Sequence, residues 1–380
     1  MWPRGHAVPA WARKGLQMTD AFLNAIGTTT PAHDVHDAFV SFAATLLPDD
    51  RLRRVFARMA DRCAIAHRYS GLVPAADPAG AVLDREGFYR RGAFPTTGAR
   101  MARYEQAALP LAIEAVRRLE GARLDSVTHL IVTSCTGFHA PGLDLQLVTA
   151  LGLRSSVERT LVGFMGCYAA FNALKLARHI VRSEPGARVL LVNLELCTLH
   201  LQETADLEQV LSFLVFADGC AASLVSAEPR GLCLDRFHAE LLPDTEPLIT
   251  WRIGDRGFDM MLSGQVPGAI ASGLVRAAPR ILGNVASGPS GPWPDIWPEL
   301  WAVHPGGRSV LDAVQTALDL APDALAASRA VLREFGNMSS CTILFVLDRL
   351  MRGARPGAAG IAMGFGPGLV AETLRFRVAG

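Results

Sequence analysis

The feature that most constrains this chain is a weak internal repeat, in which two short segments recur in the same order. Residues 166–170 (Gly-Cys-Tyr-Ala-Ala) align with residues 336–340 (Gly-Asn-Met-Ser-Ser), and each precedes an apolar helical pattern. Residues 216–219 (Phe-Ala-Asp-Gly) align with residues 365–368 (Phe-Gly-Pro-Gly), and each precedes a β-rich segment. A repeat that keeps its order predicts a chain made of two similar halves. Chance similarity among glycines and small residues is the alternative.

The periodicity of apolar residues predicts layered α/β structure from end to end. Strands are predicted at residues 22–26, 129–133, 189–196, 221–226, 296–303, 360–363 and 369–376. Helices are predicted near residues 50–65, 98–119, 167–182, 308–318, 324–334 and 339–351. Several strands are apolar on both faces, so the sheets should lie between layers of helices. With the repeat, this pattern divides the chain into an N-terminal extension (1–21) and two halves (22–230 and 231–380).

Charge and composition exclude several functional classes. The charges of the 37 basic and 36 acidic residues nearly cancel, so the net charge is too small to attract the protein to nucleic acid or to an anionic membrane. No apolar run reaches the roughly 18 residues of a membrane span, and the N-terminal residues lack the apolar core of a signal peptide. The seven cysteines are scattered without a Cys-x-x-Cys pair, which argues against a disulfide scaffold or a metal site. We expect a cytoplasmic protein.

Cys167 is the first candidate for chemistry. It follows Gly166 where an apolar segment turns into a helix rich in small residues. The unpaired N–H groups and positive dipole at a helix start favour a thiolate, which attacks thioesters. A small buried thiol with no chemical role is the alternative.

His304 and Asn337 are the second and third candidates. His304 ends an apolar run and precedes Pro-Gly-Gly, so it is expected at a strand end that substrate can approach closely. Asn337 begins the helix that corresponds to the helix of Cys167, where capping is its ordinary role. Together the three residues supply a nucleophile, a base or cation, and an amide donor, which suits acylation of a thiol and stabilisation of an enolate.

Four motifs resemble those of the type III polyketide synthases, the chalcone synthase-like family, and are closest to its bacterial alkylpyrone and alkylresorcinol synthases. They are Phe-Met-Gly-Cys-Tyr-Ala-Ala at 164–170, Trp-Ala-Val-His-Pro-Gly-Gly at 301–307, Phe-Gly-Asn-Met-Ser-Ser at 335–340 and Met-Gly-Phe-Gly-Pro-Gly-Leu at 363–369. Their order and spacing match, and the similarity extends from about Phe22 to the C-terminus. The resemblance implies a thiolase-like five-layer αβαβα fold with two similar halves, and a homodimer.

The resemblance also implies roles for particular residues. Cys167 matches the acyl-accepting nucleophile, and His304 and Asn337 match the pair that activates the thiol and stabilises the enolate of decarboxylated malonyl-CoA. Phe216 matches the aromatic gatekeeper between the CoA tunnel and the reaction cavity. The second gatekeeper position carries Met260, which departs from the plant pattern and would admit bulkier acyl groups; plain core packing is its alternative.

Other residues match the cavity wall or the CoA site. The wall positions are Cys135, Glu195, Cys197, His200, Trp251 and Ser339; Trp251 stands where plant members have glycine and would narrow the cavity. Arg58 and Arg62 match two basic residues that contact CoA in the family. The family's third basic contact falls on Val55 in this chain, and Arg54 is expected to take its place. Gly306 and Gly307, in the motif that follows His304, complete the expected CoA site. Arg51, Arg54, Arg58 and Arg62 share one helix face, for which a solvated surface is the alternative.

The predicted reaction is iterative decarboxylative Claisen condensation of malonyl-CoA onto an acyl-CoA starter, expected to be aliphatic, followed by closure to a pyrone or a resorcinol-type ring. It requires the two CoA thioesters as substrates and no metal or redox cofactor. Two alternatives stay open: a carrier-protein-dependent ketoacyl synthase that performs one condensation, and a non-catalytic acyl-CoA-binding protein of the same fold. The sequence does not define the starter, the number of extensions or the mode of ring closure.

Overall fold

The computed structural model describes residues 19–282 and 298–380. Its strands are β1 (Phe22–Thr29), β2 (His33–Asp34), β3 (Tyr69–Ser70), β4 (His129–Ser134), β5 (Glu158–Gly163), β6 (Arg188–Leu196), β7 (Asp218–Ser226), β8 (Leu232–Leu241), β9 (Ile249–Gly254), β10 (Gly257–Leu262), β11 (Leu300–Val303), β12 (Ala359–Gly366) and β13 (Val370–Val378). Its helices are α1 (His36–Leu46), α2 (Asp50–Arg62), α3 (Thr97–Arg117), α4 (Leu143–Ala150), α5 (Ala169–Ser183), α6 (Leu207–Val210), α7 (Ser212–Val215), α8 (Val266–Leu282), α9 (Arg308–Ala317), α10 (Ala326–Phe335) and α11 (Thr342–Gly353). The expected N-terminal extension lies outside the described residues up to position 18.

Strand order shows the internal repeat directly. The main sheet runs β11-β12-β13-β8-β1-β7-β6-β4-β5. In the first half, β7 pairs antiparallel with β1 and with β6, and β6 pairs parallel with β4. The second half repeats this arrangement: β13 pairs antiparallel with β8 and with β12, and β12 pairs parallel with β11. The two halves meet where β1 pairs with β8 over only two residues. The prediction of two similar halves in a thiolase-like fold is confirmed, whereas the boundary at residue 230 stays a prediction.

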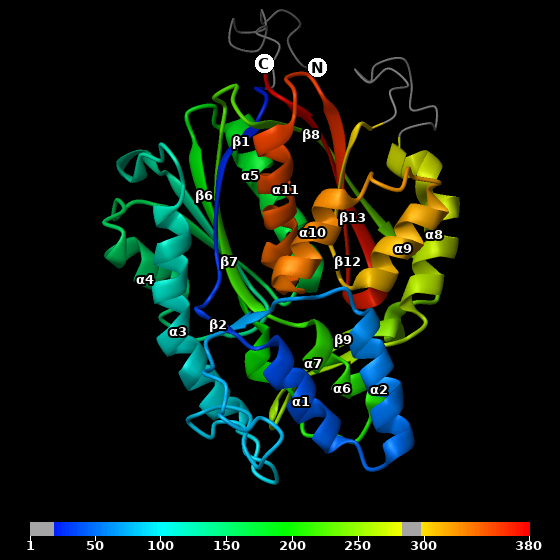
Figure 1. Cartoon of the computed structure of the whole chain (residues 1–380). Coiled ribbons are helices and arrows are strands. Elements are labelled where there is room, and N and C mark those ends of the chain that lie inside the picture. Colours follow the sequence, from blue (N-terminus) through cyan, green and yellow to red (C-terminus); the bar gives the residue numbers. More distant parts are fainter. Residues whose placement is uncertain (1–18, 283–297) are drawn as a thin grey trace, which may run out of the picture.

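Five layers result from folding these two half-sheets around a central pair of helices (Figure 1). Helices α5 and α11 lie in the middle, α3 and α4 cover the outer face of the first half-sheet, and α8 and α9 cover the outer face of the second. A smaller cluster formed by α1, α2 and α7 adjoins this body. The ends of the central helices therefore lie where the two halves meet.

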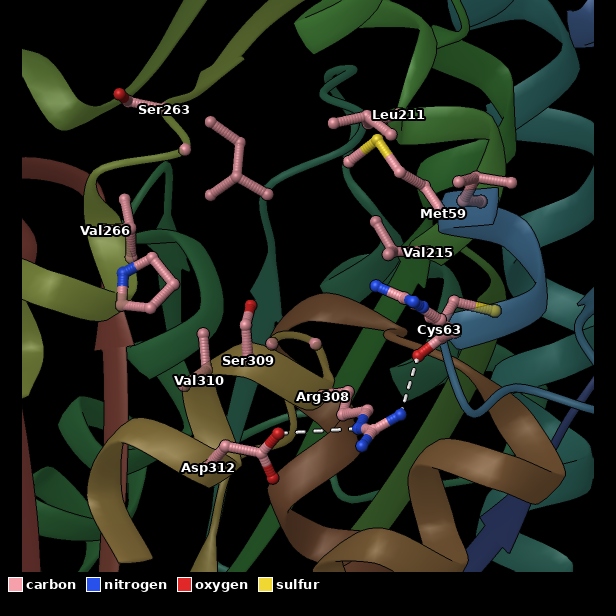
Figure 2. Close-up of a pocket in the computed structure, with 17 residues that line it drawn as sticks. Met59, Cys63, Leu211, Val215, Ser263, Val266, Arg308, Ser309, Val310 and Asp312 are labelled. Carbon is pink, nitrogen blue, oxygen red and sulfur yellow. Dashed lines mark hydrogen bonds and ion pairs between the residues drawn. The ribbon is translucent and has the colours of Figure 1, made fainter. Parts of the chain in front are cut away.

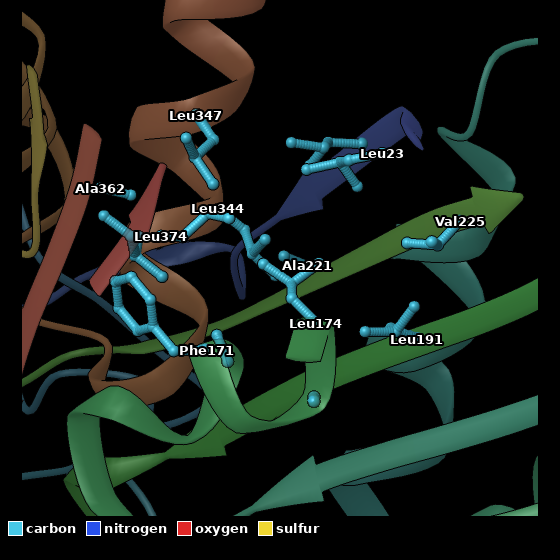
Figure 3. Packing of buried hydrophobic residues seen from close by; sticks show 14 of the residues in the cluster. Leu23, Phe171, Leu174, Leu191, Ala221, Val225, Leu344, Leu347, Ala362 and Leu374 are labelled. Carbon is cyan, nitrogen blue, oxygen red and sulfur yellow. The ribbon is translucent and has the colours of Figure 1, made fainter. Parts of the chain in front are cut away.

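The central core is formed by apolar side chains of both halves (Figure 3). Phe171 and Leu174 of α5, Leu344 of α11, Ala221 of β7 and Leu374 of β13 belong to one buried cluster. Full burial of each leucine or phenylalanine side chain stabilises the folded state by about 1.5–3 kcal/mol. Because both halves share this cluster, the starts of α5 and α11 are held in a fixed relation.

The strands predicted from the sequence include all those of the two half-sheets except β5 and β8, and no helix was predicted at α1, α4, α6, α7 or α8. Strand β5 is largely exposed at the sheet edge and begins Glu-Arg-Thr, so it lacks an apolar signal. Strand β8 becomes polar after its third residue. Helix α8 contains two glycines and two prolines, which lower its apparent helix propensity. The predicted strand at 296–303 is observed as β11, and its first two residues lie outside the described residues.

Candidate active site

Cys167 lies in the turn that joins β5 to α5. Phe164 (φ 58°) and Gly166 (φ 70°) both take the left-handed conformation in this turn. Glycine is required at 166 for space as well, because a Cβ atom there would lie 2.3 Å from Cδ of Pro367. The short 3-10 turn Gly166–Tyr168 follows and places Cys167 in the wall of a closed cavity. Strained backbone of this kind concentrates at functional sites.

Asn337 approaches from the other half of the molecule, before α11. It is 2% exposed. Its Nδ2 donates a hydrogen bond to the Gly306 carbonyl oxygen at 3.3 Å, and its Oδ1 accepts one from the Ser339 N–H at 2.9 Å. The second bond satisfies the backbone N–H of Ser339 at the start of the 3-10 turn Ser339–Cys341. The N-cap residue of this turn is Met338 and that of α11 is Cys341, neither with a side-chain cap, so the expected capping role of Asn337 is not observed.

His304 follows the last residue of β11, at the strand end where it was predicted. Its backbone N–H donates to the Met363 carbonyl oxygen at 2.7 Å, which fixes it to the neighbouring strand β12. The side chain is 1% exposed, and within residues 19–282 and 298–380 neither ring nitrogen has a hydrogen-bond partner. A buried imidazole with two free nitrogens can accept a proton from, or donate one to, a bound molecule.

A chain of short contacts brings the three predicted residues together. Cys167 Sγ lies 3.8 Å from Ser339 Oγ, and the Ser339 N–H binds Asn337 Oδ1. Asn337 Nδ2 binds the carbonyl oxygen of Gly306, and a Cβ atom built on Gly306 would lie 4.0 Å from His304 Nε2. Ser339 and Gly306 thus link the nucleophile, the amide and the imidazole, and among the described contacts no hydrogen bond joins Cys167 to His304.

Both ionisable members of this trio are neutral in the resting protein. Burial raises the pKa of the Cys167 thiol to about 11, although hydrogen bonds from Ser339 and Asn337 act to lower it. Burial also lowers the pKa of His304 to about 3. The expected thiolate at a helix start is not what the resting structure shows, because the half-buried thiol faces a small, largely apolar cavity and α5 begins only at Ala169. The cost of desolvation exceeds the benefit of the helix dipole.

Two small inner cavities lie on either side of Trp251, Met260 and Cys197, and Cys167 lines the first. The one at the thiol has a volume of about 30 Å³ and is lined by Cys135, Thr136, Gly166, Cys167, Cys197, Ile249, Thr250, Trp251, Met260, Ser339 and Pro367. The other has a volume of about 10 Å³ and is lined by Cys197, His200, Leu201, Gln202, Gln209, Ser212, Phe216, Trp251 and Met260. Every wall residue predicted from the sequence, apart from Glu195, lines one or both. Trp251, Met260 and Cys197 separate the two.

Trp251 and His200 are fixed in this wall by several contacts. Trp251 Nε1 donates to the Cys135 carbonyl oxygen at 2.9 Å. The His200 ring stacks on Phe258 at 4.2 Å between centroids. His200 Nδ1 accepts from the Phe258 N–H at 3.0 Å, so Nε2 carries the proton and donates to the Thr136 carbonyl oxygen at 2.7 Å. Burial lowers the pKa of His200 to about 3, and both nitrogens are occupied, so this histidine is a structural wall residue.

Glu195 lies behind the wall rather than in it. Its Oε2 accepts hydrogen bonds from the Cys135 N–H at 2.9 Å and from Thr136 Oγ1 at 2.8 Å. Its Oε1 accepts one from Ser340 Oγ at 2.5 Å. Burial raises the pKa of Glu195 to about 7, while these bonds lower it. The carboxyl group therefore ties the loop after β4 to the start of α11.

An outer pocket of about 610 Å³ opens to the surface (Figure 2). It is lined by Met59, Arg62, Cys63, Leu211, Leu214, Val215, Leu262, Ser263, Gly264, Val266, Pro267, Gly306, Gly307, Arg308, Ser309, Val310 and Asp312. Three predicted CoA-site residues, Arg62, Gly306 and Gly307, are among them. Because Val215 lines this pocket and Phe216 lines the inner cavity, the predicted gatekeeper lies between the two spaces.

Two predicted CoA contacts lie elsewhere. Arg54 and Arg58 are exposed on α2 but do not line the outer pocket, because only the C-terminal end of that helix reaches it. Arg308, which the sequence analysis passed over, does line it: its Nε lies 3.4 Å from Asp312 Oδ2, and its Nη1 donates to the Arg62 carbonyl oxygen at 3.4 Å. Its position directly after the His-Pro-Gly-Gly motif was the signal available in the sequence.

The fold and the paired halves define a protein of the thiolase-like class, and comparison with known proteins identifies the family. Residues 11–229 match the profile "Chalcone and stilbene synthases, N-terminal domain", and residues 234–379 match the corresponding C-terminal domain. The chain therefore belongs to the chalcone and stilbene synthase family of type III polyketide synthases, and the resemblance found in the sequence is confirmed.

Individual relatives cover nearly the whole chain. Bisdemethoxycurcumin synthase of Oryza sativa subsp. japonica is 33% identical, over 92% of this chain and 90% of its own length. The alpha-pyrone synthesis polyketide synthase-like Pks18 of Mycobacterium tuberculosis is 33% identical, over 95% and 92%. Among solved structures, PKS-I of the brown alga Ectocarpus siliculosus has a TM-score of 0.83 at 29% identity, covering 96% of this chain and all of that one. 1,3,6,8-Tetrahydroxynaphthalene synthase of Streptomyces coelicolor A3(2) has a TM-score of 0.81 at 26% identity, covering 94% and 99%.

In the part of the chain that the structure describes, no helix is long and apolar enough to cross a membrane.

Proposed function

We propose that this protein is a type III polyketide synthase that condenses malonyl-CoA repeatedly onto an acyl-CoA starter and releases a pyrone or a resorcinol-type product. The observation that supports the proposal is that Cys167 lines the inner cavity, while Asn337 contacts both Ser339 of that cavity and Gly306 of the outer pocket. We propose that a thioester whose CoA lies in the outer pocket reaches Cys167 from that side. The 33% sequence identity to the alpha-pyrone synthesis polyketide synthase-like Pks18 supports pyrones as the class of product.

In the acylation step, Cys167 Sγ attacks the thioester carbonyl carbon while its proton passes to the free imidazole of His304. The new carbon–sulfur bond forms as the bond to the CoA sulfur breaks, and the CoA thiolate takes the proton and leaves as a thiol. Proton transfer between two buried neutral groups creates opposite charges whose attraction offsets part of their desolvation cost. The raised pKa of the resting thiol keeps the cysteine protonated until a substrate arrives.

In the condensation step, malonyl-CoA loses CO2 and the electron pair of the broken carbon–carbon bond forms an enolate. Asn337 Nδ2 and one His304 N–H donate hydrogen bonds to the enolate oxygen, which carries the developing charge. The enolate carbon then forms a bond to the acyl carbon while the bond between that carbon and the Cys167 sulfur breaks, which leaves the extended chain on CoA. The Cys167 thiolate takes a proton from solvent, and a further thioester exchange returns the chain to Cys167 for the next extension. No electrons pass to an external acceptor, so we propose that the reaction needs the CoA thioesters and no metal or redox cofactor.

We infer an aliphatic starter from the chemistry of the cavity wall. The residues around Cys167 carry no charged side chain, and most present methyl, methylene, thiol or thioether groups. Met260 is flexible, and movement of its side chain joins the two inner cavities for a growing chain. Phe216 closes the route to the outer pocket and excludes water from the thioester.

The test is an assay of purified protein with malonyl-CoA and a series of acyl-CoAs, with products separated and identified by mass. We expect pyrones or resorcinols that result from two or more extensions, with highest rates for aliphatic starters. Cys167→Ala should lower product formation by at least about 10³-fold, and unchanged thermal unfolding would show that the fold is retained. A single extension that requires a carrier protein would favour the ketoacyl synthase alternative, and inactivity with every donor would favour a non-catalytic binding protein.

We also propose a homodimer formed through the edge of the first half-sheet. Strand β5 is the terminal strand, and its Leu161 is 51% exposed. A nearby groove of about 400 Å³ contains Leu145, which is 41% exposed, and Pro141. Light scattering of the purified protein tests this assembly. The cytoplasmic location expected from the sequence stays a prediction.

A further inference from the structure

Helix α2 carries a row of four arginines, of which only Arg62 reaches the pocket used in the proposed reaction. Arg51, Arg54, Arg58 and Arg62, here called the arginine row, are exposed and recur at helical spacing on one face. Within the described residues none of their guanidinium groups forms an ion pair or hydrogen bond, whereas Arg53 of the same helix binds Asp50 at 3.2 Å. The helix contains five arginines and two aspartates, in a chain whose formal net charge is +1. The positive charge is therefore local to this surface.

The arginine row leads away from the mouth of the outer pocket. Arg62 lines the pocket, but the other three residues do not. Because an α-helix rises 1.5 Å per residue, Arg51 lies about 16 Å from Arg62 along the axis. At the mouth itself, Arg62 and Arg308 already supply two guanidinium groups for the phosphates of a CoA substrate. Three arginines thus remain outside the reach of the substrate pocket.

We propose that the arginine row docks an acidic carrier protein, whose phosphopantetheine arm delivers a thioester through the outer pocket. This inference rests on the proposed function. A CoA thioester and a carrier-bound thioester present the same arm and the same reacting carbonyl, so one pocket serves both donors. The row begins at the pocket mouth, so its partner must bring a group that enters there. An acidic carrier protein meets both requirements, while a lipid surface or a nucleic acid brings no such arm.

The chemistry after docking is a thioester exchange. The Cys167 sulfur forms a bond to the acyl carbon, and the bond between that carbon and the arm's sulfur breaks. The arm leaves as a thiol with the proton that Cys167 gave to His304. The carrier protein is released with a free arm, and no oxidant or reductant takes part.

The experiment compares two donors in the same assay: an aliphatic acyl-CoA, and the same acyl group on a purified acidic acyl carrier protein. The test variant is the double substitution Arg51→Glu with Arg54→Glu. Both positions are outside the pocket and near the start of α2, where acidic residues are compatible with the helix dipole. We expect KM for the carrier-bound donor to rise at least roughly tenfold, with KM for acyl-CoA changed by less than about twofold.

Two matched controls separate docking from general effects of charge. Arg117→Glu reverses an exposed arginine on α3, across the molecule from α2 (Figure 1), and should leave both donors unchanged. Arg308→Glu changes the pocket mouth and should raise KM for both donors. Added salt should weaken the use of the carrier-bound donor more than that of acyl-CoA.

Several outcomes would overturn the inference. If acyl-CoA is a substrate and the carrier-bound donor is not, docking is rejected while the proposed function stands. If the double variant affects both donors equally or neither, the arginine row has no part in carrier recognition. A membrane contact is the other outcome. It would be shown if the protein binds phosphatidylglycerol vesicles, the double variant does not bind them, and the double variant uses the carrier-bound donor as well as the unaltered protein does. If neither donor reacts with the unaltered protein, the proposed function falls as well.

Discussion

The backbone beside Phe216 is paired with the backbone of Asn337. The Ala217 N–H donates to the Asn337 carbonyl oxygen at 2.9 Å, and the Asn337 N–H donates to the Val215 carbonyl oxygen at 2.8 Å. The residue between the inner cavity and the outer pocket is thus held directly against the residue that supplies the amide. A buried Arg68 reinforces this pairing, because its Nη1 donates to the Phe216 carbonyl oxygen at 2.9 Å.

Replacing Phe216 by alanine should therefore open the passage without moving the amide. The backbone bonds do not depend on the side chain, so Asn337 keeps its position, while the ring that excludes water is lost. We expect more hydrolysis of the Cys167 thioester and a larger fraction of free carboxylic acids among the products. Liquid chromatography with mass detection measures this ratio, with Phe216→Leu as a control that keeps the passage filled. An unchanged ratio in Phe216→Ala would show that Phe216 is not the barrier to water.

His304→Ala should lower decarboxylation of malonyl-CoA by about 10²–10³-fold, the usual cost of removing one donor to a developing oxyanion. His304→Gln keeps an N–H donor and should recover part of the rate. Because burial lowers the pKa of His304 to about 3, the imidazole is neutral at pH values well above 3. The decarboxylation rate should thus show no loss that follows His304 titration between about pH 5 and 8.

Release of CO2 from labelled malonyl-CoA, measured across this pH range, checks both statements about His304. A rate that falls with an apparent pKa near 6.5 would mean that the imidazolium is the active form. Full activity of the His304→Ala variant would remove this residue from the reaction.

The residues that could be predicted from the sequence are those with a local signal. Cys167 and Asn337 each follow a glycine with positive φ, His304 precedes a Pro-Gly-Gly segment, and the repeat indicated that the two halves would place Cys167 and Asn337 at equivalent helix starts. The protonation states could not be predicted, because they depend on how deeply both groups are buried. The three thiols of Cys135, Cys167 and Cys197 share one cavity. Cys135 and Cys197 come together because each follows one of the parallel neighbouring strands β4 and β6, which is a property of the sheet rather than of any motif.

Glu195→Gln should change how stability depends on pH. Burial raises the pKa of this carboxyl group from 4.5 to about 7 in the folded protein. Between these values the folded state holds a proton that the unfolded state has released, so the stabilising contribution is complete below pH 4.5 and is lost as pH rises through about 7. Glutamine does not titrate, and its amide oxygen can keep the hydrogen bonds from Cys135 and Thr136, while its NH2 group would donate to Ser340 Oγ in place of the bond that Oε1 accepts.

The variant should therefore lose less stability than the unaltered protein between pH 5 and 8, by up to about 3 kcal/mol. Urea unfolding at the two pH values measures the difference. Asp218, whose pKa burial raises to about 6, is present in both proteins and gives both a residual decline. Parallel stability curves for the two proteins would show that Glu195 is ionised in the folded state at both pH values.

Trp251→Gly should lengthen the polyketide. The indole lines both inner cavities and is fixed by its hydrogen bond to the Cys135 carbonyl oxygen, so its removal joins spaces of about 30 and 10 Å³ and adds the volume of the ring. We expect products longer by at least one two-carbon unit, together with a loss of stability of about 2 kcal/mol or more from the vacated space. Trp251→Phe keeps most of the ring volume but not the hydrogen bond, so it separates cavity size from wall rigidity. If Trp251→Gly makes the same product lengths as the unaltered protein, the number of extensions is set elsewhere; if Trp251→Phe lengthens the product as much as Trp251→Gly, rigidity of the wall rather than its volume limits the chain.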